Sequence, residues 1–159
     1  MSAWPPIEDV LPHRGTMLLL DRVEDYAPTH VRCSYTPRAD AWYADADGAM
    51  PAWYGIELMA QTVAAHVGLT ARQAGRPPRL GALLGSRAFR TQRAAFPAEI
   101  ALTIEASVDY RDESGLASYQ CRICVGDEEI ATARLSVYEP DDFALFLSSS
   151  AHSNASHSV

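Results

Sequence analysis

The sequence predicts an α+β fold in which one antiparallel sheet wraps around one long, buried helix. The chain has 159 residues, a typical length for one domain. Residues 52–73 are apolar on nearly every side of a helical wheel, which is typical of a buried helix. Four runs with strand-like composition follow this helix, at residues 80–90, 98–110, 116–125 and 129–138.

The first half of the chain supplies a short helix and two strands. Residues 6–13 predict a helix that a proline ends, and residues 17–26 and 30–36 predict strands. Residues 37–48 are polar and rich in turn formers, so they form a loop. Pro51 then suits the start of the long helix, and the sequence QAGRPP ends it.

The second half of the chain predicts an antiparallel meander. The turn sequences RDESG and GDEE separate its later strands. The run 98–110 alternates cleanly and places five apolar residues on one face: Ile100, Leu102, Ile104, Ala106 and Val108. From Glu139 onward the pattern is lost, which predicts one domain over residues 1–138 and a disordered tail over residues 139–159.

Composition narrows the class of protein. The formal net charge of −7 argues against nucleic acid as a partner. The odd cysteine count suits a reducing compartment, and the single C-x2-C pair lacks the further ligands of a zinc site, so no metal is expected. The chain opens without the pattern of a signal peptide and contains no uninterrupted membrane span, so a cytoplasmic location away from membranes is expected.

The basic residues are unevenly placed. All 13 cationic side chains are arginines, and six of them fall within a 22-residue stretch: Arg72, Arg76, Arg79, Arg87, Arg90 and Arg93. Arginine pairs well with carboxylates and phosphates, so this stretch is a candidate landing surface for an acidic partner. An ordinary solvated surface is the alternative reading.

The long helix carries one conspicuous carboxylate, Glu57. An ionised carboxylate is costly to bury unless it is paired or hydrogen-bonded, so Glu57 is exposed, structurally satisfied or chemically active. It falls beyond the first turn of the expected helix, on a face of small residues that a ligand can approach closely. Gln61 follows one turn later and can hold the carboxyl by a hydrogen bond.

Several motifs resemble the bacterial β-hydroxyacyl-acyl-carrier-protein dehydratases. LPHRGTMLLLDRV at residues 11–23 is similar to the opening of that family. MPAWYGIELMAQTVA at residues 50–64 is similar to its helix motif, in which M-P-G precedes a glutamate and then M-A-Q. GSRAFR and FPAEI fall where the family has its next strand and turn. The resemblance covers roughly residues 6–138.

The resemblance implies a hotdog fold, a dimer and no cofactor. It implies that Glu57 is the carboxylic acid that helps the C3 hydroxyl leave, while a histidine of the other subunit takes the C2 proton. Gln61 matches the supporting glutamine. The substrate implied is an acyl thioester on an acyl carrier protein, as in fatty acid biosynthesis.

The sequence departs from that family at the histidine. Seven residues before Met50, where the family histidine belongs, stands Tyr43, and the glycine of M-P-G is Ala52. We take Tyr43, Ala52 and Trp53 as candidate substrate-binding residues, with Met59 and Leu83 as further candidates for the apolar tunnel wall.

No other residue is an obvious replacement for the base. Asp45 and Asp47 replace the histidine loop, but an exposed aspartate is a weak base. His66 lies nine residues from Glu57, about 180° around the helix. His13 matches a family position that is not the base; we read it mainly as structural and keep it as a tentative catalytic candidate. His152 and His157 belong to the tail.

A narrower resemblance fits this departure. ApeP-like proteins, encoded with aryl polyene pigment synthases, carry L-P-H-R and a helix of the I-E-x-M-A-Q-T type without the histidine loop. This resemblance implies a dehydratase of carrier-bound polyene intermediates, or the glutamate-contributing subunit of a heterodimer with another hotdog dehydratase. A homodimer, a non-catalytic carrier-binding subunit and a hotdog thioesterase remain the alternatives.

Overall fold

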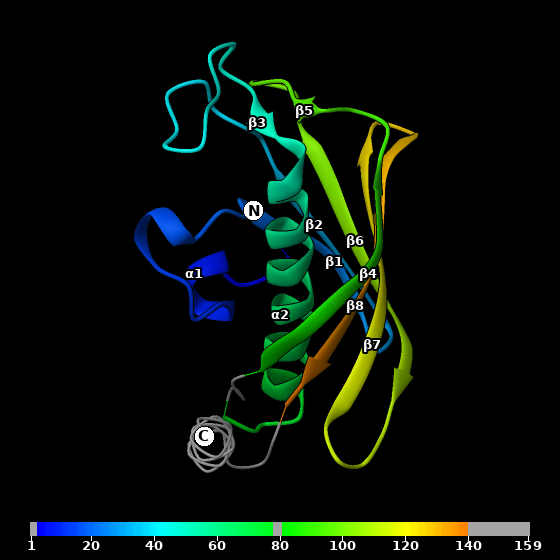
Figure 1. Ribbon diagram of the computed structural model, residues 1–159. Coiled ribbons are helices and arrows are strands. Elements are labelled where there is room, and N and C mark those ends of the chain that lie inside the picture. Colours follow the sequence, from blue (N-terminus) through cyan, green and yellow to red (C-terminus); the bar gives the residue numbers. More distant parts are fainter. Residues whose placement is uncertain (1–2, 78–80, 140–159) are drawn as a thin grey trace, which may run out of the picture.

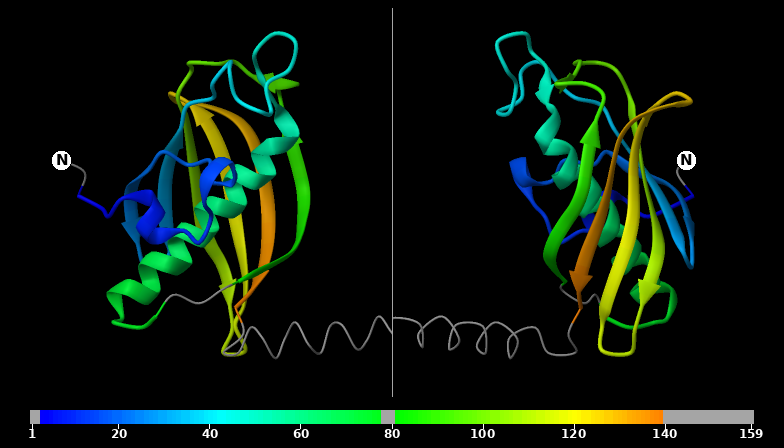
Figure 2. Two further views of the ribbon diagram at one scale, coloured as in Figure 1. Left: turned by 90° about the vertical axis from the view of Figure 1, so that its left-hand side faces the viewer. Right: turned by 45° about the vertical axis from the view of Figure 1, so that its right-hand side comes forward.

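A six-stranded antiparallel sheet curves around one long helix, which confirms the α+β prediction. The computed structural model describes residues 3–77 and 81–139. Helix α2 (Gly55–Gln73) lies against the concave side of the sheet, and the N-terminal segment with helix α1 (Ile7–Val10) crosses the side of α2 that faces away from the sheet (Figures 1 and 2). None of the described helices is long and apolar enough to span a membrane.

The strand order in the main sheet is β1-β2-β6-β7-β8-β4. These strands are β1 (Arg22–Ala27), β2 (His30–Tyr35), β4 (Ala82–Thr91), β6 (Leu102–Arg111), β7 (Leu116–Val125) and β8 (Glu128–Tyr138). Strands β6, β7 and β8 form the expected meander. Strands β1 and β4 are therefore the two edges of the sheet.

The core lies between α2 and the inner face of the sheet. Leu58, Met59 and Leu69 of α2 are fully buried among the apolar side chains of the strands, which alternate inward as the sequence predicted. Leu102, Ile104 and Ala106 follow the expected alternation. Ile100 does not: it precedes β6 and is 41% exposed, because the strand begins only at Leu102.

Other boundaries also differ from the sequence prediction. Residues 15–17 form a 3₁₀ turn, so β1 begins at Arg22 rather than at residue 17. A 3₁₀ turn at Ala52–Tyr54 precedes α2, so Glu57 lies in the first turn of the α-helix and not beyond it. Strands β3 (Met50–Pro51) and β5 (Ala95–Phe96) pair in a small second sheet that the sequence did not predict.

The expected tail lies outside the described residues, apart from its first residue. Glu139 is buried, and its amide donates to the carbonyl of Gly115, so this first residue of the expected tail packs against the domain. Nothing in the structure tests the domain boundary, which stays a prediction.

His66 is a fully satisfied core histidine on the side of α2 that faces the sheet. Its Nε2 lies 3.1 Å from each of the carbonyl oxygens of Ala27 and Pro28, so Nε2 carries the proton. Its Nδ1 lies 2.9 Å from the Tyr119 hydroxyl, which then donates to it. Burial, assisted by the nearby Arg111 guanidinium, holds the pKa of His66 below its ordinary value.

Acidification is therefore expected to destabilise the protein through His66. The unfolded chain binds a proton at His66 more readily than the folded chain, so this contribution to stability is complete above about pH 6.5 and is lost as the pH falls below it. Thermal unfolding between about pH 7.5 and pH 5 measures the effect. In His66→Gln the pH dependence in this window should be weaker; an unchanged dependence would contradict the assignment.

Candidate active site

Gln61 ties the Glu57 carboxyl to the protein. Its Nε2 donates to Glu57 Oε1 at 3.0 Å and to the carbonyl of Met17 at 2.7 Å. Its Oε1 accepts from the amides of Leu19 at 3.0 Å and Leu20 at 3.4 Å. Gln61 is completely buried, and it orients Glu57 as the sequence predicted. The same side chain also anchors residues 17–20 to α2, which the sequence did not indicate.

The Glu57 carboxyl keeps one oxygen for other partners. Within the described ranges no residue hydrogen-bonds its Oε2, and the side chain is 40% exposed in the single chain. The carboxyl is therefore not enclosed by this chain alone, and it is not consumed by backbone amides of a neighbouring loop. This leaves Glu57 able to meet a ligand.

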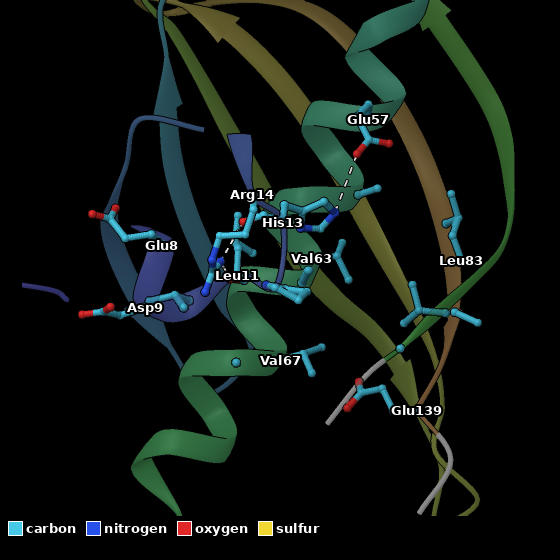
Figure 3. A pocket seen from close by; sticks show the side chains of 18 of the residues that line it. Glu8, Asp9, Leu11, His13, Arg14, Glu57, Val63, Val67, Leu83 and Glu139 are labelled. Atoms are coloured by element: carbon cyan, nitrogen blue, oxygen red, sulfur yellow. Dashed lines mark hydrogen bonds and ion pairs between the residues drawn. The ribbon is translucent and has the colours of Figure 1, made fainter. Parts of the chain in front are cut away.

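The segment around residues 10–14 lies directly on α2. Gly68 permits this approach, because a Cβ atom there would stand 2.6 Å from the carbonyl oxygen of Val10. Arg14 then fixes the turn, since its Nη1 donates to the carbonyls of Leu11 at 2.6 Å and His13 at 2.7 Å. The result is that the His13 side chain projects over the face of α2 that carries Glu57 (Figure 3).

His13 and Glu57 meet across 44 residues of sequence. The Nε2 atom of His13 lies 3.9 Å from Glu57 Oε1, and the two side chains are 27% and 40% exposed. The Nδ1 atom of His13 is buried and finds no hydrogen-bond partner among the described residues. The sequence had placed His13 at a structural position, and nothing in its local pattern indicated this neighbour.

A pocket of about 630 Å³ opens in front of this pair. It is lined by residues 8–14, by one face of α2, and by the adjacent ends of β4 and β8. Leu83 and Glu139 lie across the pocket from His13 (Figure 3). Its size suits a small organic ligand or an acyl chain, with acid–base groups on one wall.

The three candidate substrate-binding residues do not line this pocket. Tyr43 is buried, where its hydroxyl bonds the Tyr35 hydroxyl and accepts from the amide of Arg38. Ala52 is buried beside β5, and Trp53 is 65% exposed on the surface. Their role in binding stays a prediction. Met59 lies in the core and not in the pocket, whereas Leu83 lines it.

The remaining candidate bases have structural surroundings. Asp45 Oδ1 accepts from the amides of Asp47 and Ala49, so this carboxylate organises its own loop. His66 lies on the face of α2 that is turned toward the sheet and away from Glu57, as its position on the helical wheel predicted. Both are explained without chemistry at the pocket.

The described cysteines are unsuited to nucleophilic or metal chemistry. Burial raises the pKa of Cys33 and of Cys121 to about 12, so both stay protonated at neutral pH. Across residues 3–77 and 81–139 no group of three or more histidine, cysteine, aspartate or glutamate side chains could hold a metal ion.

The arginines divide into separate places. Arg72 ends α2 and lines the pocket, and Arg76 is exposed one turn beyond it. Arg87 and Arg90 are exposed on the edge strand β4, and Arg93 pairs with Glu128. Arg79 lies outside the described residues. The structure therefore resolves the predicted basic stretch into a helix end near the pocket and a sheet edge.

One long helix wrapped by a curved antiparallel sheet defines the hotdog fold, and comparison with known proteins identifies its family. The model of the ApeP-like family, described as ApeP dehydratase, matches residues 5–148. A chain of the dehydratase heterocomplex ApeI:P from Xenorhabdus doucetiae is 31% identical, with a TM-score of 0.83, over 91% of this chain and 97% of that chain. This chain belongs to the ApeP-like dehydratase family.

More distant structures share the fold alone. A hypothetical thioesterase with coenzyme A from Streptococcus pneumoniae is 14% identical, with a TM-score of 0.57, over 74% of this chain and 84% of that one. The PaaI protein of the E. coli phenylacetic acid degradation operon is 12% identical, with a TM-score of 0.59, over 74% and 81% of the two chains. No curated protein sequence matches the chain.

Proposed function

We propose that this protein dehydrates 3-hydroxyacyl thioesters, with Glu57 as the acid, alone or as the glutamate-contributing subunit of a heteromeric enzyme. The observation that carries the proposal is the Glu57 carboxyl itself. Gln61 holds one of its oxygens, and the side chain faces a pocket of about 630 Å³. The second carboxyl oxygen is left free of hydrogen bonds from the described residues on the pocket side, where a substrate hydroxyl can reach it.

The proposed reaction needs one acid and one base. The base removes a proton from C2, and the electron pair forms the C2–C3 double bond. The C3–O bond breaks as the Glu57 carboxylic acid donates its proton to the departing hydroxyl, which leaves as water. The base then returns its proton to the Glu57 carboxylate, so the pair is reset.

The proposed substrate is an acyl thioester on an acyl carrier protein, in fatty-acid or aryl polyene synthesis in the cytoplasm. Membership of a dehydratase family supports this class. The pocket supports it chemically, because apolar side chains such as Val63, Val67 and Leu83 accompany the acid on its walls. The chain length of the acyl group is left open by this argument.

The proposed partner is a second hotdog dehydratase. The relative from Xenorhabdus doucetiae is one chain of a dehydratase heterocomplex. Strand β4 of this chain is an edge strand with exposed Leu83 and Leu84, and an exposed apolar edge is typical of a surface that another chain covers. A homodimer through the same edge is the other outcome that a mass measurement in solution would reveal.

Dehydration of a 3-hydroxyacyl thioester by this protein alone, and then mixed with a second hotdog dehydratase of the same organism, tests the proposal. The conjugated product is followed by its ultraviolet absorbance. Turnover by either preparation that depends on Glu57 supports the proposal, and turnover only in the mixture supports a shared enzyme. If turnover in both is independent of Glu57, Glu57 is not the acid of the reaction and the proposal fails.

Arg72 and Arg76 are expected to help dock the acidic carrier. Reversing both to Glu should raise KM for a carrier-bound substrate about tenfold, because two favourable charge pairs become repulsive. Because Arg72 also lines the pocket, KM for a small thioester without the carrier should rise too, but by clearly less than KM for the carrier-bound substrate. Arg22→Glu, on the far edge strand β1, is a charge-reversal control away from the pocket; it also breaks the ion pair of Arg22 with Glu24, so its fold is checked by thermal unfolding. An equal effect on both substrates would indicate damage to the pocket rather than to a docking surface.

A further inference from the structure

We infer that His13 is the base that removes the C2 proton, so that one chain carries both the acid and the base of the reaction. The inference rests on the proposed function and adds the missing member of its catalytic pair. The family histidine is absent at its usual place, where Tyr43 stands, and the structure brings a different histidine to Glu57.

The distance between the two groups suits their two tasks. The proton on C2 and the hydroxyl on C3 belong to adjacent carbons, so an acid and a base that act together must stand close to each other. Each must reach its own atom within about 2.6–3.2 Å. The separation of 3.9 Å between His13 Nε2 and Glu57 Oε1 allows both to face one substrate carbon–carbon bond.

The surroundings of His13 differ from those of a structural histidine. His66 of the same chain has hydrogen-bond partners at both ring nitrogens. His13 has none at Nδ1 among the described residues, and its Nε2 faces only a carboxylate beyond hydrogen-bond distance. Of the three histidines within the described ranges, His13, His30 and His66, only His13 lines the pocket.

The protein also holds His13 in place for this role. Arg14 binds the carbonyls of Leu11 and His13, and the glycine at position 68 lets the same segment rest on α2. A histidine on a freely moving loop would lose its alignment with Glu57, whereas a fixed segment keeps the two groups in register with one ligand.

His13 and Glu57 together account for every proton that the reaction moves. Neutral His13 takes the C2 proton and becomes a cation, while Glu57 gives its proton to the leaving hydroxyl and becomes an anion. The two charges then lie side by side, so His13 can return its proton to Glu57 once the product has left. Water and the enoyl thioester are the only products, and no further reactant is needed.

Exchange of the C2 hydrogens of a saturated acyl thioester with D₂O isolates the base, since no hydroxyl has to leave. The experiment uses the protein in whichever preparation is active, alone or with the second dehydratase. Wild type and Glu57→Gln should both catalyse exchange, whereas His13→Gln should lose it and should dehydrate about 100- to 10,000-fold more slowly. His30→Gln, at a histidine outside the pocket, is the control and should behave as wild type.

A second variant and a rescue keep the test decisive. His13→Asn covers the case in which His13→Gln fails to fold, and imidazole added to His13→Ala should restore part of the exchange. Full dehydration and exchange in a folded His13 variant would overturn the inference and leave the proposed function standing. Loss of dependence on Glu57 would instead overturn the proposed function itself.

Discussion

Glu57→Gln is expected to lower the rate of dehydration about 100- to 10,000-fold. The amide is isosteric and can still accept the hydrogen bond from Gln61, so the pocket and the fold should be preserved. It cannot supply the acidic proton that the leaving hydroxyl requires. The ratio of kcat/KM values for wild type and variant, followed by absorbance of the enoyl thioester, measures the effect.

A second carboxylate at the same pocket provides the matched control. Glu8 lines the pocket but lies on α1 and is exposed. Glu8→Gln therefore makes the same chemical change without altering Glu57 or His13. It should leave turnover within about twofold of wild type. Equal losses in both variants would point to the charge of the pocket, and no loss in Glu57→Gln would make Glu57 structural.

Gln61→Ala is expected to cost stability as well as activity. It removes the acceptor of the amides of Leu19 and Leu20 and the donor to Met17, all from a fully buried position. Buried groups left unsatisfied cost about 1–3 kcal/mol each, so a loss of about 2–4 kcal/mol in the free energy of unfolding is expected. Urea denaturation measures it.

Gln73 tests whether this cost is specific. It is exposed at the end of the same helix, so Gln73→Ala should change stability by less than about 0.5 kcal/mol. A similarly small cost for Gln61→Ala would mean that residues 17–20 do not depend on this side chain for their position. The account of how Glu57 is oriented would then be wrong.

The sequence predicted the elements of the fold well because their signals are local. The expected strand at 116–125 matches β7, and α2 follows the expected helix once its 3₁₀ start is separated. The small sheet of β3 and β5 was missed because each strand has two residues, too few to show alternation. Ile100 was misplaced because the apolar alternation in the sequence starts two residues before the strand itself, which begins at Leu102.

The sequence predicted the part of the candidate site that lies on one helix, but not the part that a distant segment contributes. Glu57 and Gln61 lie one helical turn apart, so their contact follows from helix geometry. The approach of His13 depends on Gly68 and on the turn that Arg14 closes, and a single sequence does not show which distant segments a fold brings together. For the same reason the pocket positions of Arg72 and Glu139 could not be predicted.

Product analysis of one reaction tests the central claim most directly. The wild-type protein, alone and with the second dehydratase, is incubated with a 3-hydroxyacyl thioester while enoyl absorbance and free thiol are recorded together. The account predicts a conjugated product that has lost one water and keeps its thioester intact. Release of thiol without enoyl product would show a thioesterase and would contradict the account, as would an unchanged substrate in both preparations.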